Sequence, residues 1–182
     1  MISFDKETAK RIIEVEKCSD RILMVKVSAT PVDMMIIQVY MPTTDHEDDE
    51  IEDMYEQIEN IINKQKGNLN LVVMGDFNAS VGEGSDEKVV GKYGLGERNE
   101  RGQRFIEFCK KNKLVVTNTW FQQHKRRRYT WKNPGDTARF QIDYILVRQR
   151  YRNGVKCCKS YPGADAFTDH RLVAMKMSVK LK

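Results

Sequence analysis

The sequence of 182 residues contains few of the residues that stabilise small extracellular proteins. It has four cysteines, and none of them forms a CxxC pair. This spacing excludes a zinc ribbon and a disulfide-stapled scaffold. Cys157 and Cys158 are adjacent in a stretch typical of a strand, where successive side chains point to opposite faces, so we expect no bridge between them. The cysteines therefore predict a reduced, intracellular protein.

Long apolar runs are also missing. No window holds about 18 consecutive apolar residues, the length that a membrane-spanning helix needs. The N-terminus becomes polar at Asp5 and Lys6, which is not typical of a signal peptide. We therefore expect a nuclear or cytoplasmic protein that is neither secreted nor associated with a membrane. Hydrophobic residues make up 40% of the chain and suffice for a core, and the length fits a single domain over residues 1–182.

Charge is distributed unevenly along the chain. Residues 1–97 hold 10 Lys and Arg against 20 Asp and Glu, a net charge of −10. Residues 98–182 hold 21 against 6, a net charge of +15, and the two parts give the overall +5. A basic half favours a polyanionic partner, because Lys and Arg displace counterions from phosphates. The alternative is a basic surface that only keeps the protein soluble.

Strand-like and helix-like segments alternate along the chain. Apolar residues recur at helical spacing from Ile51 to about Gln65, and again within 100–112. Residues 78–98 hold five glycines and many charges, which predicts a long loop of the kind that often carries function. The pattern predicts a mixed α/β domain. The predicted strands cover 21–27, 34–40, 69–74, 114–118, 139–147 and 172–177.

Two polar side chains follow a strand that we expect to be buried. Gly75 permits a tight exit from this strand, and Asp76 and Asn78, two residues apart in extended chain, then point to the same side. A carboxylate beside an amide suits a metal-bound phosphate. The alternative is an Asx turn that closes the strand.

Three further residues are candidates for catalysis. Asp143 lies in an apolar strand, where a carboxylate is costly unless it is paired, although it could face solvent by ordinary alternation. His170 follows Asp169, and an aspartate can orient a histidine for acid–base chemistry near neutral pH. Taken alone, a histidine at a strand start is more often structural. Tyr40 closes its strand, where a half-buried aromatic is the ordinary expectation.

A basic segment precedes Tyr129 and Trp131. Cationic side chains contact phosphates and aromatic rings stack on bases, so the segment predicts contact with nucleic acid. A nuclear localisation signal and a solvated hairpin tip are the alternatives. The predicted DNA-binding residues are Lys125, Arg126, Arg127 and Arg128.

Five motifs in this order resemble the endonuclease/exonuclease/phosphatase superfamily, which includes apurinic/apyrimidinic endonucleases and the endonucleases of non-LTR retrotransposons. Details such as Gly96-Glu97-Arg98-Asn99-Glu100-Arg101-Gly102 resemble retrotransposon endonucleases of the RTE/BovB type and a host protein that carries such a domain. The resemblance covers nearly the whole chain. The five motifs are Val39-Tyr40-Met41-Pro42, Val73-Met74-Gly75-Asp76-Phe77-Asn78, Tyr129-Thr130-Trp131, Ile142-Asp143-Tyr144-Ile145-Leu146 and Thr168-Asp169-His170.

The resemblance implies a two-sheet α/β sandwich that cleaves DNA phosphodiesters with Mg²⁺, or with Mn²⁺ as the alternative ion. Tyr40 would contact the scissile phosphate, while Asp76 would activate water or protonate the leaving group. Asn78 would orient Asp76, and Thr130 would help to position the site or the substrate. The resemblance also implies that Asp143 orients His170, which would bind or stabilise the phosphate. The implied metal ligands are Asp169, Asp76 and Asn78.

The chain departs from the family pattern at its start. Family members begin with a strand that bears a metal-site Asn, and a later strand ends in Gln-Glu, whose Glu binds the metal. Neither motif is found here, and Met1–Phe4 resemble the middle of a later strand, so we expect an N-terminally truncated domain. One hypothesis is a DNA endonuclease of retrotransposon origin with weakened or lost activity. The second is a non-catalytic domain that binds DNA or protein, and a third is a phosphatase acting on phosphoinositides or nucleotides.

Overall fold

The computed structural model describes residues 5–43, 46–65, 67–163 and 168–178 of the chain. The expectation for Met1–Phe4 lies outside these residues. The elements, in chain order, are α1 (Lys6–Ala9), β1 (Ile12–Lys17), β2 (Ile22–Val27), β3 (Met34–Tyr40), α2 (Asp48–Lys64), β4 (Asn70–Asp76), α3 (Glu100–Lys111), β5 (Leu114–Val116), η1 (Thr117–Thr119), η2 (Lys125–Arg127), β6 (Trp131–Lys132), β7 (Arg139–Phe140), β8 (Asp143–Arg148), η3 (Gln149–Gly154), β9 (Val155–Tyr161) and β10 (Leu172–Met177).

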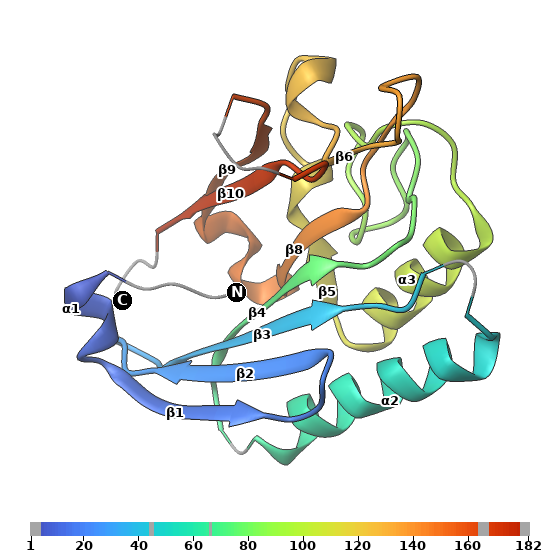
Figure 1. The fold of residues 1–182 in the computed structure, drawn as a ribbon. Coiled ribbons are helices and arrows are strands. Elements are labelled where there is room, and N and C mark those ends of the chain that lie inside the picture. Colours follow the sequence, from blue (N-terminus) through green and yellow to red (C-terminus); the bar gives the residue numbers. More distant parts are fainter. Residues whose placement is uncertain (1–4, 44–45, 66, 164–167, 179–182) are drawn as a thin grey trace.

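The framework is a six-stranded sheet in the order β1-β2-β3-β4-β8-β5. The central strands β3 and β4 are parallel and are joined by the crossover helix α2, while the other pairs are antiparallel. Helices α2 and α3 lie along one face of the sheet (Figure 1). They bury their apolar stripes there, and the largest core cluster includes Ile58, Phe105 and Leu146. No helix among the described residues is long and apolar enough to cross a membrane.

The pair β9–β10 covers part of the opposite face of the sheet (Figure 1). A second apolar cluster fills the space between them, with Val147 from β8 and Cys158 from β9 both fully buried. A sheet that packs against helices on one side and against a second sheet on the other is a layered α/β sandwich. The predicted fold class, a two-sheet α/β sandwich, is thus confirmed.

Two predicted strands are less regular than their apolar patterns suggest, since one is interrupted and the other ends early. The strand predicted over 139–147 is interrupted at Gln141 and Ile142, because the hydroxyl of Thr130 accepts the backbone N–H of Ile142 and removes it from the sheet ladder. The strand predicted over 114–118 ends at Val116. There the Thr117 side chain donates to the carbonyl of Ile145 and turns the chain into η1. In both places a side chain competes with strand pairing.

Candidate active site at the end of the sheet

Three polar residues occupy neighbouring positions at one end of the large sheet. Tyr40, the last residue of β3, pairs in register with Asp76, the last residue of β4. Asp76 in turn pairs with Asp143, the first residue of β8. Residues paired in register place their side chains on the same face of a sheet, and here that is the face covered by β9–β10. Strand register therefore brings together three predicted residues that are far apart in the sequence.

Gly75 makes this pairing possible. Its backbone has φ +147°, and a Cβ atom at this position would lie 1.9 Å from the carbonyl oxygen of Val39. Only glycine lets the end of β4 approach β3 so closely. The predicted tight exit before Asp76 is therefore a requirement of the β3–β4 contact.

Tyr40, Asp76 and Asp143 form a row along the end of the large sheet. His170 lies just before β10 and approaches this row from the face that the β9–β10 pair covers. Its Nδ1 lies 3.0 Å from Oδ2 and 3.3 Å from Oδ1 of Asp143. A carboxylate only accepts hydrogen bonds when ionised, so the proton of this bond is on Nδ1 of His170. The other ring nitrogen, Nε2, lies 3.9 Å from Oδ2 of Asp76. The imidazole is thus held between the two carboxylates with Nε2 directed at Asp76.

The surroundings shift the protonation of both partners. Asp76 is only 8% exposed. This burial, with the nearby Asp143 carboxylate as a lesser cause, raises the pKa of Asp76 to about 6. The hydrogen bond to Asp143 raises the pKa of the His170 imidazole. The site therefore combines a carboxylate and an imidazole that both bind a proton more tightly than the same groups do in water.

Thr130 is fully buried and positions the backbone around the site. Its hydroxyl oxygen accepts the N–H groups of Ile142 and Asp143, both at 3.0 Å. Its own carbonyl accepts the N–H of Arg171 at 2.7 Å, next to His170. Thr130 therefore links the segment before Asp143 to the segment that carries His170, and it acts through these residues.

Asn78 lies beside the row in a tight turn. Its backbone N–H donates to Oδ1 of Asp76 at 2.9 Å, which is the Asx turn anticipated as an alternative for this motif. Its side-chain amide donates to the carbonyl of Met41 at 2.8 Å. Asn78 therefore fixes the position of the Asp76 carboxylate, and no donor among the described residues reaches its amide oxygen.

The Asp169 carboxylate is hydrogen-bonded to Trp131 instead of to a residue of the row. Its Oδ2 accepts the indole N–H of Trp131 at 2.7 Å, and this hydrogen bond lowers the pKa of Asp169. Trp131 and His170 also form an isolated β-bridge.

Within the described part of the chain, the group of side chains close enough to share one metal ion consists of Asp76, Asp143 and His170, whose ligand atoms lie within 4.8 Å of one another. Carboxylate oxygens are the ligands that Mg²⁺ and Mn²⁺ prefer, so the two aspartates of this group fit such an ion.

Sequence patterns did not reveal Arg21. It immediately precedes β2, and its carbonyl accepts the backbone N–H of Tyr40 at 3.0 Å. The Arg21 guanidinium lies over the Tyr40 ring, 5.3 Å from the ring centre. The row at the sheet end therefore has a cation at the side opposite His170. No local motif marks Arg21, because its place depends on the pairing of β2 with β3.

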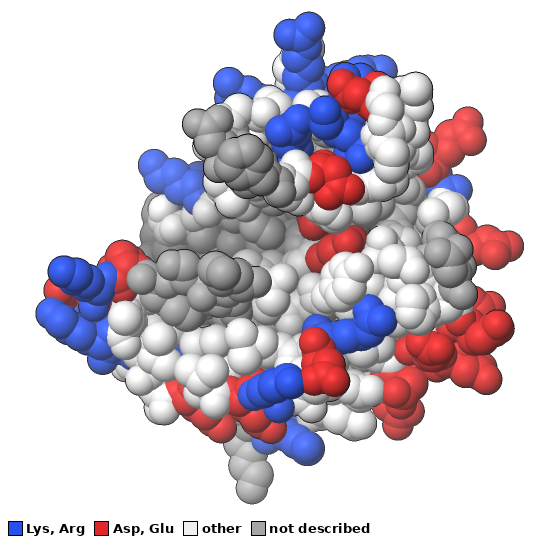
Figure 2. All heavy atoms as spheres, in the orientation of Figure 1, with Lys and Arg blue, Asp and Glu red and all other residues white. Residues whose placement is uncertain are grey.

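The basic segment divides into two kinds of residue. Lys125, Arg126 and Arg127 form η2 and are exposed. Arg128 is turned inward, and its guanidinium donates to the carbonyls of Gln123 and Gly94 at 2.8 and 3.3 Å. Figure 2 shows Lys and Arg at the top of the view, around the segment that contains η2, whereas Asp and Glu gather at the lower right over α2. The basic segment and the acidic residues of α2 therefore lie apart on this face, on which both kinds of charge also occur elsewhere.

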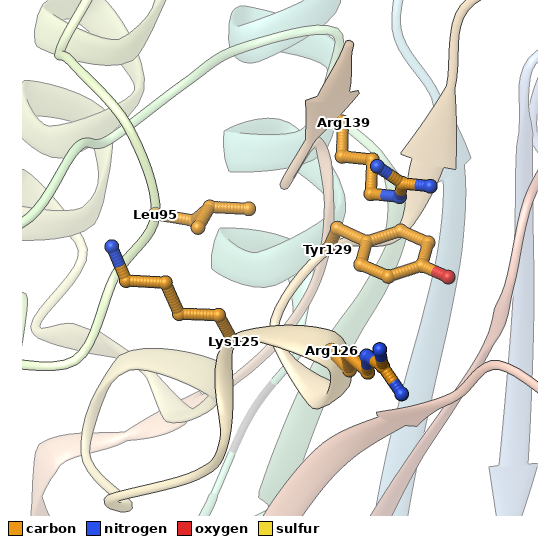
Figure 3. Close-up of a pocket in the computed structure, with 5 residues that line it drawn as sticks. All are labelled: Leu95, Lys125, Arg126, Tyr129 and Arg139. Carbon is orange, nitrogen blue, oxygen red and sulfur yellow. The ribbon is translucent and has the colours of Figure 1, made fainter. Parts of the chain in front are cut away.

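A pocket of about 470 Å³ lies between η2 and the β6–β7 pair. Figure 3 shows that Lys125 and Arg126 enter it from η2, Leu95 from the loop opposite, and Tyr129 and Arg139 from the segments on either side of β6. Three of these five lining residues are cationic.

Comparisons with known proteins identify the family and the fold. A family model described as endonuclease-reverse transcriptase matches residues 34–174. Craniofacial development protein 2 of Bos taurus is 42% identical over 178 residues, which cover 98% of this chain and 30% of that protein. The protein of the same name from Tragulus javanicus is 39% identical, with 98% and 31% covered. The chain thus spans about 30% of the length of these curated relatives.

The fold is shared with solved nucleic-acid enzymes. The endonuclease domain of TRAS1, a telomere-specific non-LTR retrotransposon, has a TM-score of 0.66 at 14% identity, over 92% of this chain and 66% of that one. The 3′ phosphatase NExo from Neisseria, solved with a product DNA hairpin, has a TM-score of 0.64 at 16% identity, over 92% and 72%. These comparisons confirm the predicted resemblance to the endonuclease/exonuclease/phosphatase superfamily.

Proposed function

The chain belongs to the endonuclease-reverse transcriptase family, and we propose that its site hydrolyses phosphodiester bonds of DNA with the help of a divalent cation. The observation that carries the proposal is the arrangement of Asp76, Asp143 and His170 at the end of the sheet. The likeness to the TRAS1 domain supports an origin among retrotransposon endonucleases.

The three residues divide the chemistry between them. Asp143 holds the Nδ1 proton of His170, so a protonated His170 presents Nε2–H to an oxygen of the scissile phosphate, where negative charge grows. Ionised Asp76 accepts the proton of the attacking water. The water oxygen then bonds to phosphorus, the bond to one ester oxygen breaks, and that oxygen takes a proton from solvent.

A cation and an aromatic residue complete the proposed phosphate site. Mg²⁺ or Mn²⁺ held by Asp76 and Asp143 would neutralise charge on the phosphoryl oxygens. The sequence also predicts Asp169 and Asn78 as ligands, and these roles remain part of the proposal. Tyr40 is 49% exposed and lies in register beside Asp76, where its hydroxyl can donate to the phosphate. Arg21, stacked on Tyr40, adds a second cation on that side.

The proposal is tested by nicking of supercoiled plasmid by the purified chain. The assay is run with Mg²⁺, with Mn²⁺ and with a chelator, and His170→Ala serves as the variant that lacks the proton donor. We expect metal-dependent nicking that falls at least about 100-fold in His170→Ala. Circular dichroism spectra of both proteins establish that they are folded.

A non-catalytic DNA-binding domain is the second candidate. It is favoured by the exposed cations Lys125, Arg126 and Arg127, none of which forms an ion pair with a carboxylate among the described residues. Folded protein that does not nick, but binds duplex DNA with an affinity that falls steeply with salt, would establish this candidate in place of the enzyme.

A further inference from the structure

In the part of the chain that the structure describes, the active-site end of β8 has no strand beside it on one side. β5 pairs with residues 146–148 of β8 and then ends at Val116. The stretch of β8 from Asp143 to Ile145 therefore extends past the end of β5. Backbone N–H and carbonyl groups that are buried without a partner are costly, so those of this stretch need partners other than a strand.

Three side chains take the place of a strand there. The N–H of Asp143 donates to the hydroxyl of Thr130 at 3.0 Å. The carbonyl of Ile145 accepts the hydroxyl of Thr117 at 2.6 Å. The two groups between them, the carbonyl of Asp143 and the N–H of Ile145, both bond to the side-chain amide of Asn118, each at 3.0 Å. Asn118 thus satisfies two backbone groups of β8 with one side chain.

The chemistry of the amide group explains why an asparagine suits this position. A carbonyl needs a donor and an N–H needs an acceptor, and a primary amide offers one of each in the same plane. An ionised aspartate would offer acceptors alone, and a leucine would offer neither group. Asn118 is only 5% exposed, so it does not reach a substrate and acts through Asp143.

Asn118 also contacts the second sheet. The thiol of Cys158, a fully buried residue of β9, donates to the amide oxygen of Asn118 at 3.6 Å. β9 pairs with β10, and His170 lies two residues before β10. Asn118 therefore lies where the large sheet meets the second sheet, and the hydrogen bond between Asp143 and His170 spans the same interface.

We propose that Asn118 is a positioning residue of the active site. It fixes the backbone of Asp143 beyond the end of β5, so that the Asp143 carboxylate stays 3.0 Å from Nδ1 of His170. Without the amide, the carbonyl of Asp143 turns toward other partners and the end of the strand moves with it. A displacement of about 1 Å at a reacting group can lower a rate about 100-fold. The effect on catalysis rests on the proposed nuclease function, whereas the effect on the strand end does not.

The test compares Asn118→Leu with the matched control Thr117→Val. Both variants keep the volume of a buried side chain and remove a hydrogen bond to Ile145, but only Asn118→Leu also removes the bond to Asp143. Amide hydrogen exchange is measured by NMR in the metal-free protein at Asp143 and at Val147. Val147 is fully buried and is paired with both β4 and β5, so it reports the stability of the whole fold.

We expect the ratio of the exchange rate of Asp143 to that of Val147 to rise at least about 10-fold in Asn118→Leu. In Thr117→Val the ratio should change less than about twofold, because a loss of overall stability accelerates exchange at both positions alike. Asn118→Asp keeps an acceptor for Ile145 and lacks the donor for Asp143, so it should raise the ratio even if the leucine variant does not fold.

Plasmid nicking in Mg²⁺ gives the second measurement. The rate at saturating DNA is expected to fall about 10-fold in Asn118→Leu, with little change in DNA affinity, and to stay within about twofold in Thr117→Val. A nicking rate that stayed at the wild-type level despite a raised exchange ratio would overturn the catalytic part of the proposal.

Two exchange results would overturn the proposal as a whole. One is a ratio that rises equally in Asn118→Leu and Thr117→Val, and the other is a ratio that rises in neither, since Asn118 would then contribute to overall stability alone. Neither result depends on nicking. The expected exchange ratios in a protein that does not nick would contradict the nuclease function and leave the positioning of Asp143 standing.

Discussion

The active-site cluster and the pocket beside η2 are built in different ways. Asp76 and Asp143 stand on the ends of two strands in the middle of the large sheet, and strand register fixes their separation. The pocket residues stand on loops and short helical turns, and contacts of Arg128 hold these segments together. The cluster is anionic and the pocket is cationic. The comparison teaches that the proposed chemistry is placed on residues whose separation the sheet fixes, and the proposed substrate contacts on loops held by side-chain contacts.

The largest expected effect is on catalysis. Asp76→Asn keeps the shape of the side chain and removes the group that accepts a proton from water. We expect plasmid nicking to fall by at least about 100-fold, because general base catalysis contributes about 10² to 10⁴ in rate. The rate should fall at saturating DNA, with little change in DNA affinity. A loss that appeared only in affinity would remove the distinction between the cluster and the pocket.

The next effect concerns the stability of the cluster. Thr130→Ala leaves two buried N–H groups, those of Ile142 and Asp143, without their acceptor. We expect the free energy of unfolding in urea to fall by about 3 kcal/mol. Thr130→Ser keeps the hydroxyl and should recover most of this loss. If the serine variant were as unstable as the alanine variant, the missing methyl group would be responsible in place of the hydrogen bonds.

A third prediction uses the raised pKa of Asp76. Because the pKa is about 6 in the folded chain against an ordinary 3.8, the folded state binds this proton more tightly than the unfolded state. The stability of the metal-free protein should therefore fall as pH rises from about 4 through about 6. At pH 7.5 in chelator, Asp76→Asn is expected to stabilise the chain by on the order of 2 kcal/mol. At pH 4 the two proteins should unfold at the same urea concentration, and a gain of equal size at both pH values would contradict this explanation.

The smallest effect is expected at the edge of the cluster. Trp131→Phe keeps an aromatic ring against Phe140, 5.5 Å away, and removes only the indole N–H that holds Asp169. If Asp169 contributes to metal binding, the Mg²⁺ concentration needed for half-maximal nicking should rise about 10-fold, as is usual when a ligand loses its supporting hydrogen bond. An unchanged Mg²⁺ requirement would place Asp169 outside the metal site.

Much of the fold was predictable because it depends on local periodicity. The strand ending at Tyr40, the helix that follows it and the strand before Asp76 are found near their predicted bounds. The exposed strand β1 was not predicted, since its glutamates alternate with Ile13 and Val15 and give no clear buried face. The interruption before Asp143 could not be predicted either, because the Thr130 side chain that causes it lies twelve residues away.

The candidate site was also predictable only as far as local patterns reach. Motifs indicate that Asp76, Asp143 and His170 are important, but only the strand register of the two aspartates and the packing of His170 against them show that the three meet. Arg21 was missed because it joins the row through its pairing with Tyr40. Arg128 resembles its neighbours in sequence, yet its guanidinium is directed at carbonyls of residues 94 and 123, and a basic run does not reveal such partners.

The most direct test compares two variants in one nicking experiment. Rates for the wild-type chain, Asp143→Asn and Arg126→Ala are measured in Mg²⁺ at DNA concentrations below and above saturation. Our account predicts that Asp143→Asn is impaired at every DNA concentration, because His170 loses its charged partner. Arg126→Ala should be impaired only at low DNA concentration. The account would be contradicted if Asp143→Asn nicked as fast as wild type at saturating DNA, since the cluster would then not perform the chemistry.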